Sequence, residues 1–130
     1  VTSKWIPGLL TNFNTVSLRI RELKKLKQMD ESGEMSKYKK KEISKFHKTI
    51  AKLENALGGV QDMSDLPDCI FIIDAVRDNI AVKEANVLGI PVVAFADSNT
   101  DPSNIDYPIT ANDDAIKSIK YILSQVEQVL

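Results

Sequence analysis

The sequence has little of the residue types on which several classes of function depend. Among its 130 residues there is one cysteine, Cys69, and one histidine, His47. A single cysteine excludes an internal disulfide and is typical of a reducing compartment, and this pair alone does not make a dedicated zinc site. We therefore expect Cys69 to be a small apolar residue at the start of a buried strand, and His47 to be exposed.

Long apolar runs and nucleotide-binding motifs are also missing. No stretch approaches the roughly 20 apolar residues that a membrane-spanning helix needs, and the N-terminus shows no basic-then-apolar secretory signal. The sequence contains neither of the glycine-rich phosphate-binding motifs nor the G-x-S-x-G nucleophile elbow. These absences argue against a membrane segment and a phosphate-binding loop, so the catalytic case depends on two aspartates alone; we expect no cofactor, no resident metal ion and no small-molecule substrate.

The net charge of −1 hides a separation of charge along the chain. Residues 19–52 carry 12 Lys and Arg against 5 Asp and Glu, a net charge of +7, whereas residues 53–130 carry 4 against 13, a net charge of −9. Such a separation indicates the chemistry of the partners rather than the fold. The basic segment suits a polyanion such as RNA.

Residues 13–57 predict two helices joined by a short polar turn. Apolar residues recur three and four positions apart in both halves, which marks one face of each helix. They are Phe13, Val16, Ile20, Leu23 and Leu26 in the first half, and Ile43, Phe46, Ile50, Leu53 and Leu57 in the second. Thr11 or Asn12 can cap the first helix, and Gly33 can end it with a positive φ. We expect an antiparallel helical hairpin of the coiled-coil type.

After residue 66 the pattern becomes that of a parallel α/β sheet. Residues 69–73 and 92–96 are short apolar runs, typical of strands buried on both faces. Residues 79–88 between them predict a helix that Gly89 ends, which gives a compact βαβ unit in about 28 residues with a right-handed crossover. A third, very short strand is expected at Ile109.

A last helix is expected at the C-terminal end of the chain. Asn112 can cap it, with Asp113 and Asp114 in its first turn. Its buried stripe is predicted to consist of Ile116, Ile119, Leu123, Val126 and Leu130. The predicted sheet is thin, so we expect more strands of it N-terminal to Val1.

Asp74 and Asp97 are the candidates for catalysis. Both follow predicted strands, and ligands of open α/β sheets bind at the carboxyl ends of the strands. Two carboxylates there could hold Mg²⁺ or orient a hydroxyl group, as in an α/β nucleotide- or metal-binding enzyme. The alternative, which we favour, is that acidic residues only make the strand ends soluble.

The basic residues of the hairpin are the stronger candidates for function. An antiparallel hairpin should bring two sets to the same tip, namely Lys24, Lys25 and Lys27 from the first helix, and Lys37, Lys39, Lys40 and Lys41, interleaved with Tyr38, from the start of the second. A cationic tip can contact several phosphates and release counterions. The open alternatives are a solvated face, or a hairpin that binds proteins and never RNA.

Short motifs along the chain resemble those of a known family. Trp5, Gly8 and Leu10-Thr11-Asn12-Phe13 are similar to an R-W-x-G-G-x-L-T-N segment, and Leu57-Gly58-Gly59-Val60, Asp62-Met63 and Leu66-Pro67-Asp68 to an L-G-G-I-x-x-M-x-x-L-P-D segment. The order continues with Ile73-Asp74, Lys83-Glu84-Ala85, Leu88-Gly89-Ile90-Pro91, Asp97-Ser98-Asn99, Asp101-Pro102 and Asn112-Asp113-Asp114-Ala115. Over essentially its whole length, the chain resembles the second protein of the bacterial small-subunit ribosomal series, without its N-terminal part.

The resemblance implies a Rossmann-like parallel sheet, incomplete in this chain, with a protruding hairpin. Residues 1–12 would then be a loop that leads in from the rest of the α/β domain, residues 13–57 the hairpin, and residues 58–130 the C-terminal half of the α/β domain. The chain departs from the family in two places: Lys4 stands where Arg is usual, and Ile6-Pro7-Gly8 replaces Leu-Gly-Gly, which removes a backbone N–H donor.

The resemblance also implies a function. The family is a non-enzymatic constituent of the small ribosomal subunit, bacterial and cytoplasmic or organellar, that binds rRNA and neighbouring ribosomal proteins in assembly and translation. Asp74, Asp97 and Asn99 would then be structural. The residues we predict to contact RNA are Lys4, Trp5, Thr11, Asn12, Arg19, Lys24, Lys25, Lys37, Tyr38, Lys39, Lys40, Lys41 and Lys45.

Overall fold

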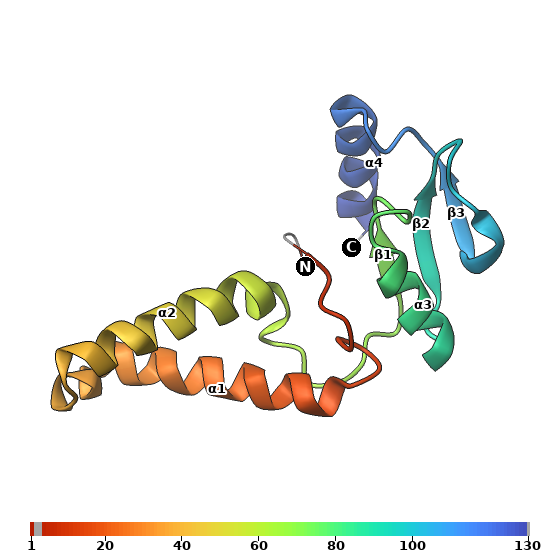
Figure 1. Cartoon of the computed structure of the whole chain (residues 1–130). Coiled ribbons are helices and arrows are strands. Elements are labelled where there is room, and N and C mark those ends of the chain that lie inside the picture. Colours follow the sequence, from red (N-terminus) through yellow and green to blue (C-terminus); the bar gives the residue numbers. More distant parts are fainter. Residues whose placement is uncertain (2–3, 130) are drawn as a thin grey trace. The chain divides into compact units, whose positions relative to one another are not determined.

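The computed structural model describes residue 1 and residues 4–129, which form the helices and strands of Figure 1. In chain order these are α1 (Phe13–Glu31), η1 (Glu34–Lys37), α2 (Lys40–Leu57), η2 (Gly58–Val60), β1 (Ile70–Ile72), α3 (Asn79–Leu88), β2 (Val92–Ala96), η3 (Pro102–Asn104), β3 (Tyr107–Thr110) and α4 (Ile116–Val129). The η elements are single 3₁₀ turns. No described helix combines the length and apolar character that crossing a bilayer requires.

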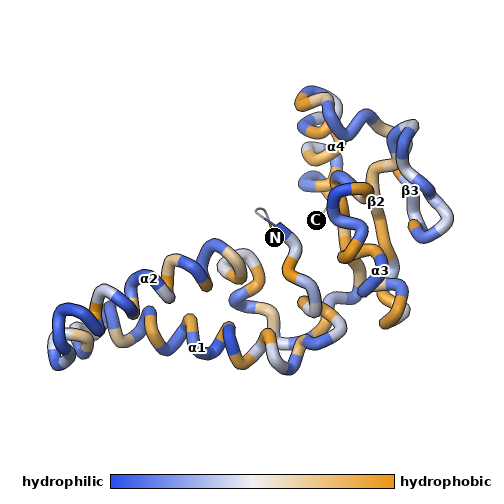
Figure 2. The backbone as a smooth tube through the Cα atoms, in the orientation of Figure 1, coloured by the Kyte–Doolittle hydropathy of each residue, from blue (hydrophilic) through white to orange (hydrophobic). Residues whose placement is uncertain are grey.

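The chain divides into two compact units, the hairpin unit (Val1–Leu66) and the sheet unit (Pro67–Leu130). In the hairpin unit α1 and α2 run antiparallel, and the apolar residues recur along both helices (Figures 1 and 2). Ile20, Leu23 and Leu57 are buried, and the other residues of the predicted seam are half-buried. The 3/4 spacing therefore predicted the helix faces that pack together.

The segment before α1 closes the base of the hairpin. Leu9 is 2% exposed and packs with Ile20 and Leu57. Around this cluster lie Trp5, Ile6, Val16, Leu53, Ala56 and Val60, all partly buried. Gly8 turns the chain with φ of 87°, a left-handed conformation that glycine adopts without steric strain. The short lead-in segment is thus part of the core of the hairpin unit.

The sheet unit contains three parallel strands in the order β1-β2-β3. Ile70 pairs with Val92 at one boundary, and Val93 pairs with Tyr107 at the other. Helix α3 joins β1 to β2 and packs on β2, and Gly89 ends it with φ of 69°. The α/β fold class with a parallel sheet, including a short strand at Ile109, is therefore confirmed.

Burial of β1 differs from the prediction. The strand comprises Ile70–Ile72 only, and Phe71 is 38% exposed between two buried neighbours. Cys69 precedes the strand and is exposed, so it is not the small buried residue that we expected. The reason is that β1 is an edge strand: among the described strands its one neighbour is β2. The Phe71 ring contacts the Phe95 ring edge to face, with a centroid distance of 5.7 Å, but the rest of the Phe71 side chain is only partly covered.

The last helix also differs from its prediction. Among its described residues none is buried: Ile116 is 69% exposed and Leu123 is 37% exposed. No other described element packs extensively against α4, so Ile119 and Val126 of its apolar stripe are only half-buried. Leu130, the last residue predicted for that stripe, lies outside the described residues.

Asn112 has a capping geometry, although not at the helix itself. Its Oδ1 accepts hydrogen bonds from the backbone N–H groups of Asp114 and Ala115, both at 2.9 Å. Because α4 begins at Ile116, Asn112 stabilises the turn before the helix rather than its first residue.

Candidate nucleic-acid interface

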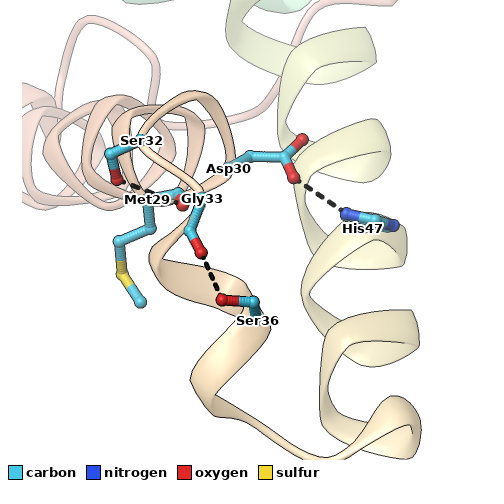
Figure 3. A network of polar contacts seen from close by, with 6 residues as sticks. All are labelled: Met29, Asp30, Ser32, Gly33, Ser36 and His47. Atoms are coloured by element: carbon cyan, nitrogen blue, oxygen red, sulfur yellow. Dashed lines mark hydrogen bonds and ion pairs between the residues drawn. The ribbon is translucent and has the colours of Figure 1, made fainter.

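The tip of the hairpin is a closed turn built around Gly33 and Met35. Gly33 has φ of 73° and terminates α1 as predicted. Its carbonyl oxygen accepts hydrogen bonds from the backbone N–H of Ser36 at 3.1 Å and from the Ser36 hydroxyl at 2.7 Å (Figure 3). Met35 is 4% exposed, so an apolar side chain fills the inside of the turn. The tip is therefore a packed structure and not a loose loop.

Two side-chain contacts tie this turn to the helices. The ring of Tyr38 meets the ring of Phe46 edge to face, with a centroid distance of 5.3 Å. Nε2 of His47 on α2 lies 3.1 Å from Oδ1 of Asp30 on α1 (Figure 3). His47 is exposed, as predicted, and its contact joins the two helices.

Lysines stand on the outside of this turn. The Glu42 carboxylate accepts a hydrogen bond from the backbone N–H of Lys39 at 3.0 Å, which fixes the start of α2 where residues 39–41 are exposed. Lys25 and Tyr38 line one hollow of about 440 Å³ at the tip. Within the described part of the chain, the predicted lysines that take part in no ion pair are Lys25, Lys39, Lys40, Lys41 and Lys45, together with Lys4.

Two lysines of α1 do not lie where the sequence placed them. Nζ of Lys24 is 3.2 Å from Oδ1 of Asp62, and Lys27 pairs with Glu54 and donates a hydrogen bond to Gln61 at 3.1 Å. Gln61 and Asp62 reach α1 because the chain folds back after α2, whereas Glu54 lies on α2 itself. The side chains of Lys24 and Lys27 are therefore held by residues 54–62 and are not free at the tip, which corrects our expectation; RNA binding by Lys24 stays a prediction.

Two further cations of the predicted set have acidic neighbours on their own helix. Arg19 lies 2.9 Å from Glu22, and Lys37 lies 3.8 Å from Glu34. These side chains are largely exposed, and exposed pairs of this kind stabilise a protein by only about 0–1 kcal/mol. Such pairs can exchange one anion for another at little cost.

The remaining predicted RNA contacts lie at the base of the hairpin. Lys4, Thr11 and Asn12 are exposed, whereas Trp5 is partly buried against the core of this unit. Asn12 precedes α1, but its Oδ1 accepts a hydrogen bond from the Thr15 hydroxyl at 2.8 Å instead of capping a backbone N–H. The structure therefore divides the predicted residues into a tip set and a base set.

A groove of about 500 Å³ lies between α1 and α2 at the base, and we call it the base groove. Its apolar lining includes Ile6, Val16, Leu53 and Ala56, and its polar lining includes Asn12, Thr15, Arg19, Glu22, Thr49 and Lys52. The residues predicted from the sequence include only Asn12 and Arg19 among these. The sequence did contain a pattern that could have predicted the groove, because its polar residues also recur three and four positions apart and therefore share one face of each helix.

The strand-end aspartates Asp74 and Asp97 both lie near Asp113 in the sheet unit, but each carboxylate accepts a hydrogen bond from a backbone N–H of the turn that follows it. Asp74 accepts a hydrogen bond from the Arg77 N–H at 2.8 Å, and Asp97 accepts one from the Ser98 N–H at 2.6 Å. Burial, and then the charges of Asp74, Asp97 and Asp114, raise the pKa of Asp113. Among the described residues, no group of three or more His, Cys, Asp or Glu side chains could hold a metal ion. The geometry favours a structural role for these aspartates.

Comparisons with known proteins agree with the motifs. The family model for ribosomal protein S2 matches residues 1–130. The chain is 51% identical, over all of its length, to the small ribosomal subunit protein uS2 of a Nitratiruptor species. It is 48% identical, over 97% of its length, to the proteins of that name from Buchnera aphidicola subsp. Schizaphis graminum and Syntrophobacter fumaroxidans. The chain spans about half the length of these curated relatives, that is 49%, 52% and 46% respectively.

Proposed function

The chain belongs to the ribosomal protein S2 family, and from this premise we propose that it is a structural constituent of the small ribosomal subunit that binds rRNA through its helical hairpin. The family is one of structural proteins and not of enzymes. In this role the protein works on the ribosome, in the cytoplasm of a bacterium, with rRNA and neighbouring ribosomal proteins as partners. The domain division expected from the sequence, with the hairpin at residues 13–57, is part of the proposal.

One observation carries this proposal: lysines that form no ion pair with any described residue lie on the outside of a packed turn. The interior of the turn is fixed by Met35 and by the Tyr38–Phe46 contact, so little order has to be gained when the tip binds. The lysines at residues 39–41 and Lys25 can therefore contact phosphates without first leaving an acidic partner. Phosphate contacts of this kind position a protein on RNA and release counterions.

The ion pairs rank the predicted contacts. Lys25, Lys39, Lys40, Lys41 and Lys45 form the first rank because no acidic side chain in the described part of the chain holds them. Arg19, Lys24 and Lys37 form the second rank, since each must exchange a carboxylate for a phosphate. Tyr38, exposed by 42%, can stack on a base or sugar at the tip.

The test is the salt dependence of rRNA binding by the full-length protein. Replacing Lys39, Lys40 and Lys41 together by Gln should weaken binding to small-subunit rRNA. For every lysine–phosphate interaction that the substitution removes, the slope of log affinity against log salt should become shallower by about 0.7–0.9. The matched control replaces Lys83, Lys117 and Lys120 of the sheet unit by Gln, which removes the same charge from exposed positions of the acidic unit.

The two triple variants separate local contact from net charge. If both lower the affinity and the slope equally, only the overall charge matters and the tip has no special role. If the protein with its full set of lysines does not bind small-subunit rRNA and does not co-sediment with small subunits, the proposed function is wrong.

A further inference from the structure

The base groove has the chemistry of a nucleotide site. It joins an apolar surface, formed by Val16, Leu53 and Ala56, to neutral hydrogen-bonding groups and to cations from both helices. We propose that this groove binds one unstacked nucleotide of the RNA that the hairpin contacts. This inference rests on the proposed function and adds to it a site that reads a base rather than a phosphate.

The apolar part of the groove is rigid before any ligand arrives. Val16, Leu53 and Ala56 pack on the buried cluster of Leu9 and Ile20, which fixes their positions. A flat nucleobase gains most from a preformed apolar surface, because the protein side of the contact does not have to be ordered on binding. A groove of about 500 Å³ accepts a single nucleotide but not a duplex. Proteins that read RNA by sequence bind such splayed-out bases.

The polar part of the groove is arranged for the edge of a base. The Thr15 hydroxyl donates to Oδ1 of Asn12 at 2.8 Å, which fixes the oxygen of the carboxamide and leaves its NH₂ group as a donor for a ligand. Thr49, opposite on α2, donates its own hydroxyl proton to the Lys45 carbonyl at 3.0 Å, so its oxygen can still accept. Together these groups offer a donor and an acceptor to one ligand.

Charge at the groove favours a nucleotide over an apolar side chain of another protein. Arg19 from α1 and Lys52 from α2 flank the groove, and Glu22 neutralises only Arg19, at 2.9 Å. In the described part of the chain Lys52 has no ion pair. A phosphate on either side of the bound base would meet these cations, whereas an apolar side chain would use neither of them.

The experiment fills the groove without changing charge. Ala56→Leu places a larger side chain in the groove, and Ala51→Leu makes the same change at an exposed position of the same helix, outside the groove. In the full-length protein, Ala56→Leu should weaken binding to small-subunit rRNA on the order of tenfold, and the log-salt slope should become shallower by no more than the loss of the phosphate contacts of Arg19 and Lys52 explains. Ala51→Leu should bind as the parent protein does.

A second measurement locates the nucleotide. Chemical probing of RNA 2′-hydroxyl reactivity should show one unpaired nucleotide that the parent and Ala51→Leu proteins protect and the Ala56→Leu protein does not. Thermal unfolding of each variant establishes that it folds. If Ala56→Leu destabilises the protein, Thr49→Val removes the hydroxyl at nearly constant volume and should abolish the same protection.

Each other outcome overturns the inference. Equal affinity and equal protection for Ala56→Leu and Ala51→Leu exclude a nucleotide in the groove, while the rRNA-binding proposal stands on its lysine variants. Normal rRNA binding by Ala56→Leu together with poor incorporation into subunits assigns the groove to a protein side chain. Absence of rRNA binding by the parent protein removes the proposed function and the groove site together.

Discussion

The two units of this chain differ in how far they bury the apolar side chains of their helices. Leu23 on α1 and Leu123 on α4 occupy equivalent places in a 3/4 spacing, yet Leu23 is 0% exposed and Leu123 is 37% exposed. The spacing determines which face of a helix is apolar, but burial requires a second element against that face. Helix α2 supplies it for α1, whereas no described element packs extensively against α4.

The units also differ in charge. The hairpin unit has 13 Lys and Arg against 8 Asp and Glu, a net charge of +5, and the sheet unit has 4 against 10, a net charge of −6. The boundary between the units therefore separates a basic surface from an acidic one. Charge of opposite sign suits partners of opposite kind, a polyanion for the hairpin unit and cationic groups for the sheet unit.

The largest effect should come from deleting equivalent leucines in the two units. Leu23→Ala leaves a cavity in the hairpin core and should lower the free energy of unfolding by about 2–5 kcal/mol. Leu123→Ala removes a partly exposed side chain and should cost about 1 kcal/mol or less. Chemical denaturation of the full-length variants measures both. A cost for Leu123→Ala as large as that for Leu23→Ala would mean that α4 is covered in the full-length protein, and the contrast between the units would vanish.

A smaller effect should follow from replacing the turn glycines, and it should be alike in the two units. Gly33 and Gly89 have φ of 73° and 69°, and a Cβ at either would meet nothing within 4 Å. The cost of Gly33→Ala and of Gly89→Ala is therefore conformational only, about 1 kcal/mol each. Gly59→Ala, where φ is not positive and a Cβ would meet Val1 at an ordinary 3.7 Å, is the control and should be nearly neutral. Thermal unfolding of the three variants measures these losses of stability. A clearly larger loss at Gly33 or at Gly89 would show that the positive φ is not the only cause at that position.

The smallest effect concerns the acidic strand ends of the sheet unit. Because the folded-state pKa of Asp113 is raised, by burial first and then by neighbouring carboxylates, its contribution to stability is full below its ordinary pKa and is lost as the pH rises through the raised pKa. Asp113→Asn should therefore raise Tm by about 1–2 °C at neutral pH, with no gain in acid.

Asp101 provides a control of opposite sign for that measurement. Hydrogen bonds from the side chain and the backbone N–H of Ser103 lower the pKa of Asp101, so its contribution is present above its ordinary pKa and lost as the pH falls. Asp101→Asn should lower Tm slightly at neutral pH. If both substitutions shift Tm in the same direction at neutral pH, the opposite pKa shifts described for Asp113 and Asp101 do not govern the stability of the sheet unit.

Much of the fold could be predicted because its signals are local. The seam from Ile43 to Leu57 follows from spacing, and Gly33 and Gly89 end helices because glycine alone adopts their φ without strain. The parallel strands around residues 70 and 94 follow from apolar runs that flank a helix. Each of these predictions needs only residues that are close in sequence.

The predictions that failed depend on residues far apart in sequence. Lys24 pairs with Asp62, which is 38 positions away, because the chain folds back after α2, and no spacing rule contains that turn. Exposure of Phe71 and Cys69 depends on which strands lie beside β1. The base groove was missed for the same reason, since Thr15 and Thr49 are ordinary helix residues until two helices meet.

The length of α1 sets a fixed distance between the two proposed RNA-binding sites of the hairpin. Its 19 residues rise about 28 Å, and the base groove is lined along α1 as far as Glu22, so the middle of the groove and the lysine tip are held roughly 20 Å apart along the hairpin. Two weak contacts at a fixed separation bind as one strong contact when the target presents both sites at that spacing, because the second contact forms at a high effective concentration. An RNA with the right nucleotide and the right phosphates at the wrong separation would engage only one end. The spacing itself would then select the binding site.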